Sequence, residues 1–536
     1  MTCPILPPEL LGIIFELVAI EHPFLVPFTV PCDVPTHPPT DRGPFELAGP
    51  QCDECRTTFP LGWFSVTHVC RRWRDAAYAT SSLWTRINNY MPRPAVEVCL
   101  ECSRGQPLSL FIGRHRHVLT HPNQDWTWPG AVLEEEELAR IAFLFSQAHL
   151  RIQKLVTTRD LLRRLIPIFA QSPLHNVQSI NLLFCDKLNE NSADLIASLR
   201  PHCLRELSLV GLTFIQWSQP GTLWPDIVAS SLHSLVCDGI GYTPLVIRGL
   251  RGLRSLRFLR VHKMSGNMQD MEAATSGTAI ELLHCQEIDL DGLDEQVAGF
   301  LNALHLRPDV RLRIRSRLLH HSIHMLPPNV AAIRAHLFRP GCQPITPFRT
   351  VTFHHVSSYA WRLCASRQVE SASRSDLDVT YDTSLVRKSP YEDFFGLSPT
   401  IADNIIGLHI TSPDPGATNN LPRLLRHNFS SFTSLELLRV CGTGMVAQAV
   451  DDLLPQPDDP PLFPVLRELV LADLPSQMLS AEYEELGVKL LVIFNTRRKA
   501  GVPIRVLQVP DGEMMHGKTV WDELSSLVTV RIAQDT

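Results

Sequence analysis

Two cysteines at metal-ligand spacing, Cys52 and Cys55, are the first residues in this sequence that could do chemistry. A Cys-x-x-Cys pair supplies half of the tetrahedral ligand set that Zn²⁺ prefers. Three further candidate ligands, Cys32, His22 and His37, lie nearby in the sequence. No second closely spaced pair lies in the same segment, residues 21–60. We therefore predict no metal here and keep a zinc site as the alternative.

A second cluster of candidate ligands is formed by His320, His321 and His324. Its spacing would place two imidazoles on one helical turn, but no acidic or cysteine partner follows at a recognisable distance, so we interpret these histidines as solvated.

Enzyme signatures are also missing: the chain has no Walker loop, no dinucleotide glycine fingerprint, no Gly-x-Ser-x-Gly and no His-Glu-x-x-His. We predict a non-enzyme without a cofactor or catalytic residues, and keep an enzyme with an unfamiliar site as a weaker alternative.

The composition indicates which classes of partner and which cellular compartment to expect. The 536 residues carry a net charge of -6, which gives no broad basic field and argues against nucleic acid. No apolar run is long enough for a membrane span, and the first residues lack a targeting pattern, so we expect no membrane partner. Many cysteines, such as Cys185, Cys237 and Cys285, lie in apolar runs, which favours reduced thiols and a cytoplasmic or nuclear protein.

The elements that would position any site begin with two helical segments. Apolar residues at helical spacing predict a short helix that starts near Pro8. Residues 21–60 contain nine prolines and little periodicity, so we predict an inserted loop. Helical spacing returns after Leu61, with Phe64, Val69 and Trp73 four or five residues apart, and predicts two or three further helices.

These two segments resemble the F-box family in its fungal F-box-like form. The resemblance rests on the following residues: Leu6, Pro7, Pro8, Glu9, Leu10, Leu11, Ile14, Phe15, Val69, Cys70, Arg71, Arg72, Trp73, Arg74, Leu83 and Trp84. It covers about 50 residues and departs from the family pattern in the long insert between its two halves.

The resemblance implies that this region binds the Skp-type adaptor of a cullin-RING ubiquitin ligase, while the rest of the chain holds a protein substrate. The implied adaptor-binding residues are Leu6, Pro7, Leu10, Leu11, Ile14, Phe15, Val69, Cys70 and Trp73. We expect adaptor contact from Pro7, Leu10, Ile14 and Phe15 in particular. Leu11, Val69 and Trp73 suit the helical core equally well.

Beyond residue 100 an apolar pattern at relative positions 1, 4 and 6 recurs every 24 to 29 residues, which is the size of a leucine-rich repeat. Its clearest copies are Val177/Ile180/Leu182, Leu204/Leu207/Leu209, Leu232/Leu235/Cys237, Leu256/Leu259/Val261 and Cys285/Ile288/Leu290. Wider-spaced copies follow at Phe348/Val351/Phe353, Leu435/Leu438/Val440, Leu466/Leu469/Leu471 and Ile504/Leu507/Val509. Position 9 is apolar or cysteine where that family usually carries asparagine, so we expect irregular repeats.

Together these patterns predict an α/β chain: an N-terminal all-α F-box module in residues 1–90, then a leucine-rich-repeat-like α/β solenoid with parallel strands in residues 91–536. The chain would be the substrate-recognition adaptor of a Skp-cullin-F-box type ubiquitin ligase. The alternative is an interaction scaffold outside any ligase, in which the helices cap the solenoid.

Strand alternation predicts which side chains face the open side of that solenoid, because positions 3, 5 and 7 point away from positions 4 and 6. We predict a substrate-binding face that includes Arg260, Glu287, Asp289, Asp291 and Arg439. Arg260 should partly neutralise Asp289 in the next strand, which would leave Glu287 and Asp291 as an acidic ridge. Such a ridge would favour a protein partner with exposed lysine or arginine.

Overall fold

The computed structural model of this chain has a mixed α/β fold built around a large, mostly parallel sheet. It describes the following residues: 6–21, 28–29, 57–58, 62–89, 91–113, 135–185, 203–212, 230–239, 243–264, 279–307, 309–317, 332–333, 348–357, 360–367, 376–382, 403–412, 424–456, 459–472, 480–509 and 519–532. Contacts divide the chain into two compact units. Unit 1 comprises residues 1–245 and 252–256, and unit 2 comprises 246–251 and 257–536. The predicted boundary at residue 90 lies inside unit 1 and stays a prediction.

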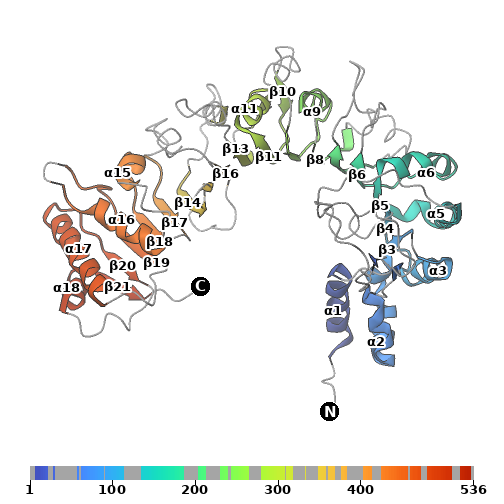
Figure 1. Cartoon of the computed structure of the whole chain (residues 1–536), viewed down its shortest axis with the longest axis horizontal. Coiled ribbons are helices and arrows are strands. Elements are labelled where there is room, and N and C mark those ends of the chain that lie inside the picture. Colours follow the sequence, from blue (N-terminus) through green and yellow to red (C-terminus); the bar gives the residue numbers. More distant parts are fainter. Residues whose placement is uncertain are drawn as a thin grey trace, which may run out of the picture. The chain divides into compact units, whose positions relative to one another are not determined.

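Helices form the first part of unit 1 (Figure 1). They are α1 (Pro8–Glu21), the 3-10 helix η1 (Gly62–His68), α2 (Arg71–Ala79) and the 3-10 helix η2 (Ser81–Thr85). Helix α1 contacts α2, η1 and η2, so segments on either side of the predicted insert pack together. Within that insert, β1 (Phe28–Thr29) pairs antiparallel with β2 (Thr57–Thr58), which corrects the expectation of a loop without regular structure.

A parallel sheet completes unit 1. Its strands are β3 (Arg86–Asn88), β4 (Leu108–Ile112), β5 (Ile152–Thr158), β6 (Ser179–Cys185), β7 (Glu206–Leu212) and β8 (Ser234–Asp238). Each strand pairs with the next in chain order. The connections include α3 (Arg93–Cys102), α5 (Glu135–Ala148), the 3-10 helix η3 (His149–Arg151) and α6 (Arg159–Gln171). Helix α6 packs on β5 and β6 and covers one face of the sheet.

The sheet of unit 2 runs in the order β9, β11, β13, β16, β15, β14, β17, β18, β19, β20, β21. The first six in chain order are β9 (Phe258–His262), β11 (Glu287–Leu293), β13 (Arg311–Arg317), β14 (Thr350–Ser357), β15 (Ala360–Ser366) and β16 (Leu377–Asp382). The others are β17 (Gly407–Thr411), β18 (Leu437–Cys441), β19 (Glu468–Ala472), β20 (Val506–Val509) and β21 (Thr529–Ile532). Strand β15 is antiparallel to both neighbours, which corrects the prediction of parallel strands throughout.

The remaining elements of unit 2 connect these strands. They are α11 (Asp294–Asn302), α15 (Leu424–Phe429), α16 (Thr443–Leu453), α17 (Ser480–Lys499), α18 (Thr519–Leu527) and the parallel pair β10 (Ile280–Leu282) and β12 (Leu304–Leu306). Helix α9 (Thr243–Leu250) spans the division between the units. The turn from β18 into α16 needs glycine, because Gly442 has φ +96° and a Cβ there would lie 2.2 Å from the Ser412 carbonyl oxygen.

The predicted repeat register is confirmed for three strand pairs, β6 with β7, β7 with β8 and β9 with β11. Ile180 pairs with Leu207, which pairs with Leu235, and Leu259 pairs with Ile288. The predicted positions 1, 4 and 6 of the first five copies are all buried, as expected for side chains under the helices. Alternation of burial along β8, β9 and β13 shows that their other face reaches solvent. That second face is where a sheet of this kind can display functional side chains.

Candidate functional site

Helix α1 in unit 1 carries large apolar side chains on two faces. Leu11, Phe15 and Ala19 are buried at the four-residue spacing of a helix packed against a core. On the other side, exposed fractions range from 38% to 59% for Leu10, Ile13, Ile14 and Leu17. With Leu6 and Val69, these exposed residues are called the α1 apolar face below. A contiguous exposed apolar patch of this kind is typical of a binding surface.

Specific contacts with the following helices hold α1 on its buried side and at its edges. The ring of Phe15 lies 5.3 Å from the ring of Trp73. The guanidinium of Arg72 donates a hydrogen bond to the Leu6 carbonyl, and the Ser82 hydroxyl donates one to the Glu16 carboxylate. These contacts fix the helix so that the α1 apolar face points away from the core.

The structure separates the predicted adaptor-binding residues into two groups. Leu6, Pro7, Leu10, Ile14, Val69 and Cys70 are exposed, whereas Leu11 and Phe15 are buried and Trp73 is half-buried. Direct adaptor contact by Phe15 is therefore corrected to a supporting position in the core, and Val69 lies on the surface.

The predicted adaptor-binding set left out Ile13 and Leu17, which lie on the same exposed face. The i, i+3, i+4, i+7 spacing that links them to Leu10 and Ile14 could have identified them.

The second candidate surface is the polar face of the unit 2 sheet from β9 to β18, called the charged face below. The register aligns side chains of adjacent strands across it, for example Asp289 beside Arg313 and Arg313 beside Asp378. Arg260, Glu287, Asp289, Asp291 and Arg439, predicted for substrate binding, all belong to the strands of this face.

Asp289 lies at the centre of a buried polar cluster on this face. Its carboxylate accepts a hydrogen bond from Arg260 Nε at 2.9 Å and lies 3.1 Å from His262 Nε2. Burial of Asp289 opposes ionisation, but the hydrogen bond from His262 and the charges of His262 and Arg260 outweigh it, so the pKa of this carboxyl is lowered. Because only 3% of the Asp289 side chain is exposed, it positions its neighbours and does not face a partner.

The predicted acidic ridge is wrong because Glu287 and Asp291 are paired. Glu287 forms an ion pair with Arg313 at 3.1 Å, and Asp291 forms one with Arg317 at 3.0 Å. Both arginines come from β13, the strand next to β11. The predicted pairing of Arg260 with Asp289 is confirmed.

Strand β13 is an element of the charged face that sequence reasoning missed. Its sequence RLRIRSR places Arg311, Arg313, Arg315 and Arg317 on the charged face, while Leu312, Ile314 and Ser316 are buried. A repeat search based on apolar residues overlooks this strand, because only two of its residues, Leu312 and Ile314, are apolar and buried. The strict alternation of arginine with smaller residues is the signal that could have revealed it.

Further along the charged face, Arg362 of β15 binds Asp378 of β16 through two hydrogen bonds of 2.9 and 2.6 Å. These hydrogen bonds raise the pKa of the Arg362 guanidinium. His354 Nδ1 lies 2.6 Å from the Thr411 hydroxyl. Burial, and then the charge of Arg362, lowers the pKa of His354; burial, and then the charge of Arg439, lowers the pKa of His409.

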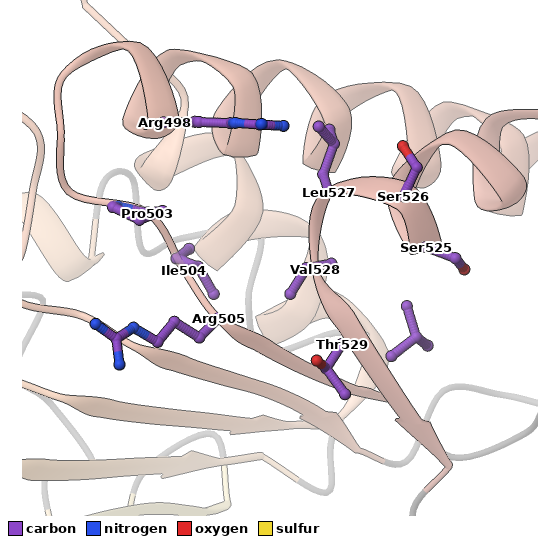
Figure 2. A pocket seen from close by; sticks show the side chains of 10 residues that line it. Arg498, Pro503, Ile504, Arg505, Ser525, Ser526, Leu527, Val528 and Thr529 are labelled. Atoms are coloured by element: carbon purple, nitrogen blue, oxygen red, sulfur yellow. The ribbon is translucent and has the colours of Figure 1, made fainter.

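A third candidate is a shallow hollow of about 720 Å³ near β20 and β21, shown in Figure 2. Its polar lining includes Arg498 at the end of α17, Arg505 before β20, and Ser525 and Ser526 of α18. The hollow is largely open to solvent, and its polar groups do not converge on one point in Figure 2. It therefore offers less for specific recognition than the two larger surfaces.

The described residues contain no cluster of three or more histidine, cysteine or acidic side chains that could hold a metal ion. The candidate ligands at residues 22–55 and 320–324 lie outside the described residues. No helix within the described ranges is long and apolar enough to cross a membrane.

Buried thiols fit the prediction of cysteines acting as small hydrophobes: burial raises the pKa of Cys99 and of Cys285 to about 12.

Comparison with known proteins adds no assignment, because no protein-family model and no curated protein sequence matches this chain.

Proposed function

We propose that this chain is the substrate-recognition adaptor of a Skp-cullin-F-box type ubiquitin ligase. The α1 apolar face would dock the Skp-type adaptor, and the charged face of unit 2 would hold a protein substrate. The observation that supports this proposal most directly is the exposure of Leu10, Ile13, Ile14 and Leu17 on one helix of the F-box-like segment. Burying such a patch against a partner would stabilise the complex by removing apolar surface from water.

The proposed mechanism is positional. A chain that holds the adaptor at one site and a substrate at another raises the effective concentration of substrate lysines near a ubiquitin-charged conjugating enzyme. Such a role needs two separate binding surfaces and no catalytic group of its own. The α1 apolar face in unit 1 and the charged face in unit 2 supply those two surfaces.

Alanine substitution tests the docking surface. Leu10→Ala and Ile14→Ala should each remove a contact worth about 2 kcal/mol at a hot spot, so the double variant should bind a purified Skp-type adaptor about a thousandfold more weakly. The matched control is Leu283→Ala, which truncates a similarly exposed leucine in unit 2. Affinity is measured by calorimetry on the full chain, and circular dichroism verifies that each variant is folded.

Adaptor binding that survives the double substitution would sink the docking proposal. The alternative is a scaffold whose helices cap the repeats. It is supported by the direct connection between the helices and the sheet, since η2 ends at Thr85 and β3 begins at the next residue. The two hypotheses are separated by the wild-type chain: a cap function predicts no affinity for a Skp-type adaptor or a cullin complex.

A further inference from the structure

We propose that the charged face binds an extended acidic segment of a partner protein, with Arg315 of β13 and Arg362 of β15 as the principal anion-binding groups. This inference rests on the proposed function for the role of that partner as a captured substrate. It reverses the sign expected from the sequence, where Glu287 and Asp291 predicted a partner with basic residues.

The described side chains of the face carry a net positive charge, although the whole chain has a net charge of -6. Among the described side chains from β9 to β18, seven arginines face four carboxylates. The arginines are Arg260, Arg311, Arg313, Arg315, Arg317, Arg362 and Arg439, and the carboxylates are Glu287, Asp289, Asp291 and Asp378. Cations gathered on one surface create a local potential that attracts and orients an anionic partner.

The ion pairs leave part of that positive charge without a counter-charge. Arg260, Arg313, Arg317 and Arg362 each bind one of the four carboxylates. Arg311, Arg315 and Arg439 form no ion pair with any described side chain. Arg315 is also exposed and stands between Arg313 and Arg317 on the same face of β13. Like charges this close oppose folding, and an anionic ligand would offset their repulsion.

The register places three donors in one row across adjacent strands, with Asp291 of β11 at the end of this row, opposite Arg315. Arg315 lies opposite Thr380 of β16, and Thr380 lies opposite Arg362 of β15. Since neighbouring strands are about 4.8 Å apart, the two arginine backbones are separated by about 10 Å with the threonine hydroxyl between them. Asp378 holds the Arg362 guanidinium through two hydrogen bonds, so this donor is already oriented before a ligand arrives.

An acidic peptide fits this pattern better than a nucleic acid. In an extended peptide every second side chain points the same way at about 6.8 Å intervals, which matches the spacing of Arg313, Arg315 and Arg317 along β13. The carboxylates of Glu287, Asp291 and Asp378 would repel a continuous phosphate backbone, whereas discrete acidic side chains can lie between them.

One described aromatic side chain, Phe258 of β9, lies on the charged face, and the Arg260 guanidinium lies 5.4 Å from its ring centroid. From β13 to β18, no described side chain of the face is phenylalanine, tyrosine or tryptophan, the residues on which single-stranded bases stack. Around Arg315 and Arg362, the described part of the face therefore favours a protein segment over a single-stranded nucleic acid.

The test uses the full chain and a fluorescein-labelled 12-residue peptide with glutamate at every second position and serine between. A peptide with glutamine in place of glutamate is the uncharged control. Fluorescence anisotropy should detect binding of the acidic peptide alone, and its affinity should fall at least tenfold between 50 and 200 mM NaCl because exposed charges are screened. Equal affinity for the two peptides, or no binding of either, would overturn the proposal.

Substitution locates the binding site. Arg315→Gln should weaken binding of the acidic peptide at least tenfold. Arg307→Gln removes the same charge from an exposed arginine outside the sheet, between β12 and β13, and should leave binding within about twofold of wild type. Equal losses in the two variants would mean that only net charge matters and would contradict a built site. Tighter binding of an oligouridylate than of the acidic peptide would replace the proposal with RNA binding.

The same variants separate this inference from the proposed function. Arg315→Gln should leave adaptor affinity unchanged, and the double variant Leu10→Ala, Ile14→Ala should leave peptide affinity unchanged. If the wild-type chain binds the acidic peptide but not the Skp-type adaptor, only the ligase proposal is contradicted. Retained adaptor binding without peptide binding would defeat this inference alone.

Discussion

At the scale of single residues, Asp289 shows how a buried charge is accommodated on the charged face. Its carboxylate would be costly to bury alone, but Arg260 and His262 supply two partners from the neighbouring strand β9. Glu287 and Asp291 on the same strand are only partly buried, and their partners Arg313 and Arg317 are about half exposed. The three carboxylates on this strand therefore contribute differently to the free energy of unfolding, because they differ in burial.

We expect Asp289→Ala to lower the free energy of unfolding by about 2 to 3 kcal/mol, because it leaves the partly buried donors of Arg260 and His262 without their acceptor. The matched control Asp291→Ala breaks a more exposed pair and should cost less than about 1 kcal/mol. Urea unfolding followed by circular dichroism measures both values. Equal losses would show that burial does not distinguish the two carboxylates.

The lowered pKa values of His354 and His409 predict a pH dependence. The groups that face them are Arg362, Arg439, Asp378 and Thr411, and burial contributes most to each shift. A lowered pKa in the folded state means that the unfolded state binds more protons below the ordinary histidine pKa near 6.5. The free energy of unfolding should therefore decrease as the pH falls from 7 towards 5.

The double variant His354→Gln, His409→Gln tests this assignment, since it should flatten the decrease of the unfolding free energy between pH 7 and 5. The control is His284→Gln, which replaces an exposed histidine elsewhere in unit 2 and should keep the wild-type slope. An unchanged slope in the double variant would mean that other groups carry the pH dependence.

At the scale of elements, each strand contributes one apolar face to a core that it can complete only with its neighbours. Leu207 of β7 lies between Ile180 of β6 and Leu235 of β8 in the parallel register. All three side chains are buried, while Ser208 of β7 points to the other face and is half-buried. The stability of the sheet in unit 1 therefore depends on packing between repeats more than on any single strand.

Truncation of this core should be costly and specific to one face of β7. We expect Leu207→Ala to lower the free energy of unfolding by about 3 kcal/mol, through lost apolar contacts and the cavity left behind. Ser208→Ala changes the adjacent side chain on the opposite face and should cost less than about 1 kcal/mol. Chemical unfolding compares the two, and similar losses would contradict the assigned faces of β7.

At the scale of the whole molecule, the two units present surfaces of opposite character. Unit 1 exposes an apolar helix face, and unit 2 exposes arginines on a sheet. An apolar face supplies affinity through burial, whereas a charged face mainly sets association rate and specificity. This division suits a chain that holds one partner firmly and selects another, as the proposed function requires.

The sequence alone determined the local features of this protein. Helical spacing indicated α1 and α2, and the 1, 4, 6 pattern predicted which side chains of β6 to β11 are buried and which residues of neighbouring strands pair. The burial and pairing predicted for the strands are confirmed because side-chain direction alternates with a period of 2 along a strand, which is a local property. The repeat spacing then set the register one strand at a time.

Only the tertiary structure decided which charges meet on the charged face. Arg315 of β13 lies beside Thr380 of β16, more than 60 residues later, because β14 to β16 fold back with β15 antiparallel. No local sequence pattern predicts that β13 pairs with β16. Likewise, whether Glu287 and Asp291 form a free acidic ridge depends on the neighbouring strand, and β13 supplies the arginines that pair with them. Charge interactions depend on distance in space, so the sign of this face emerged only when the strands were placed side by side.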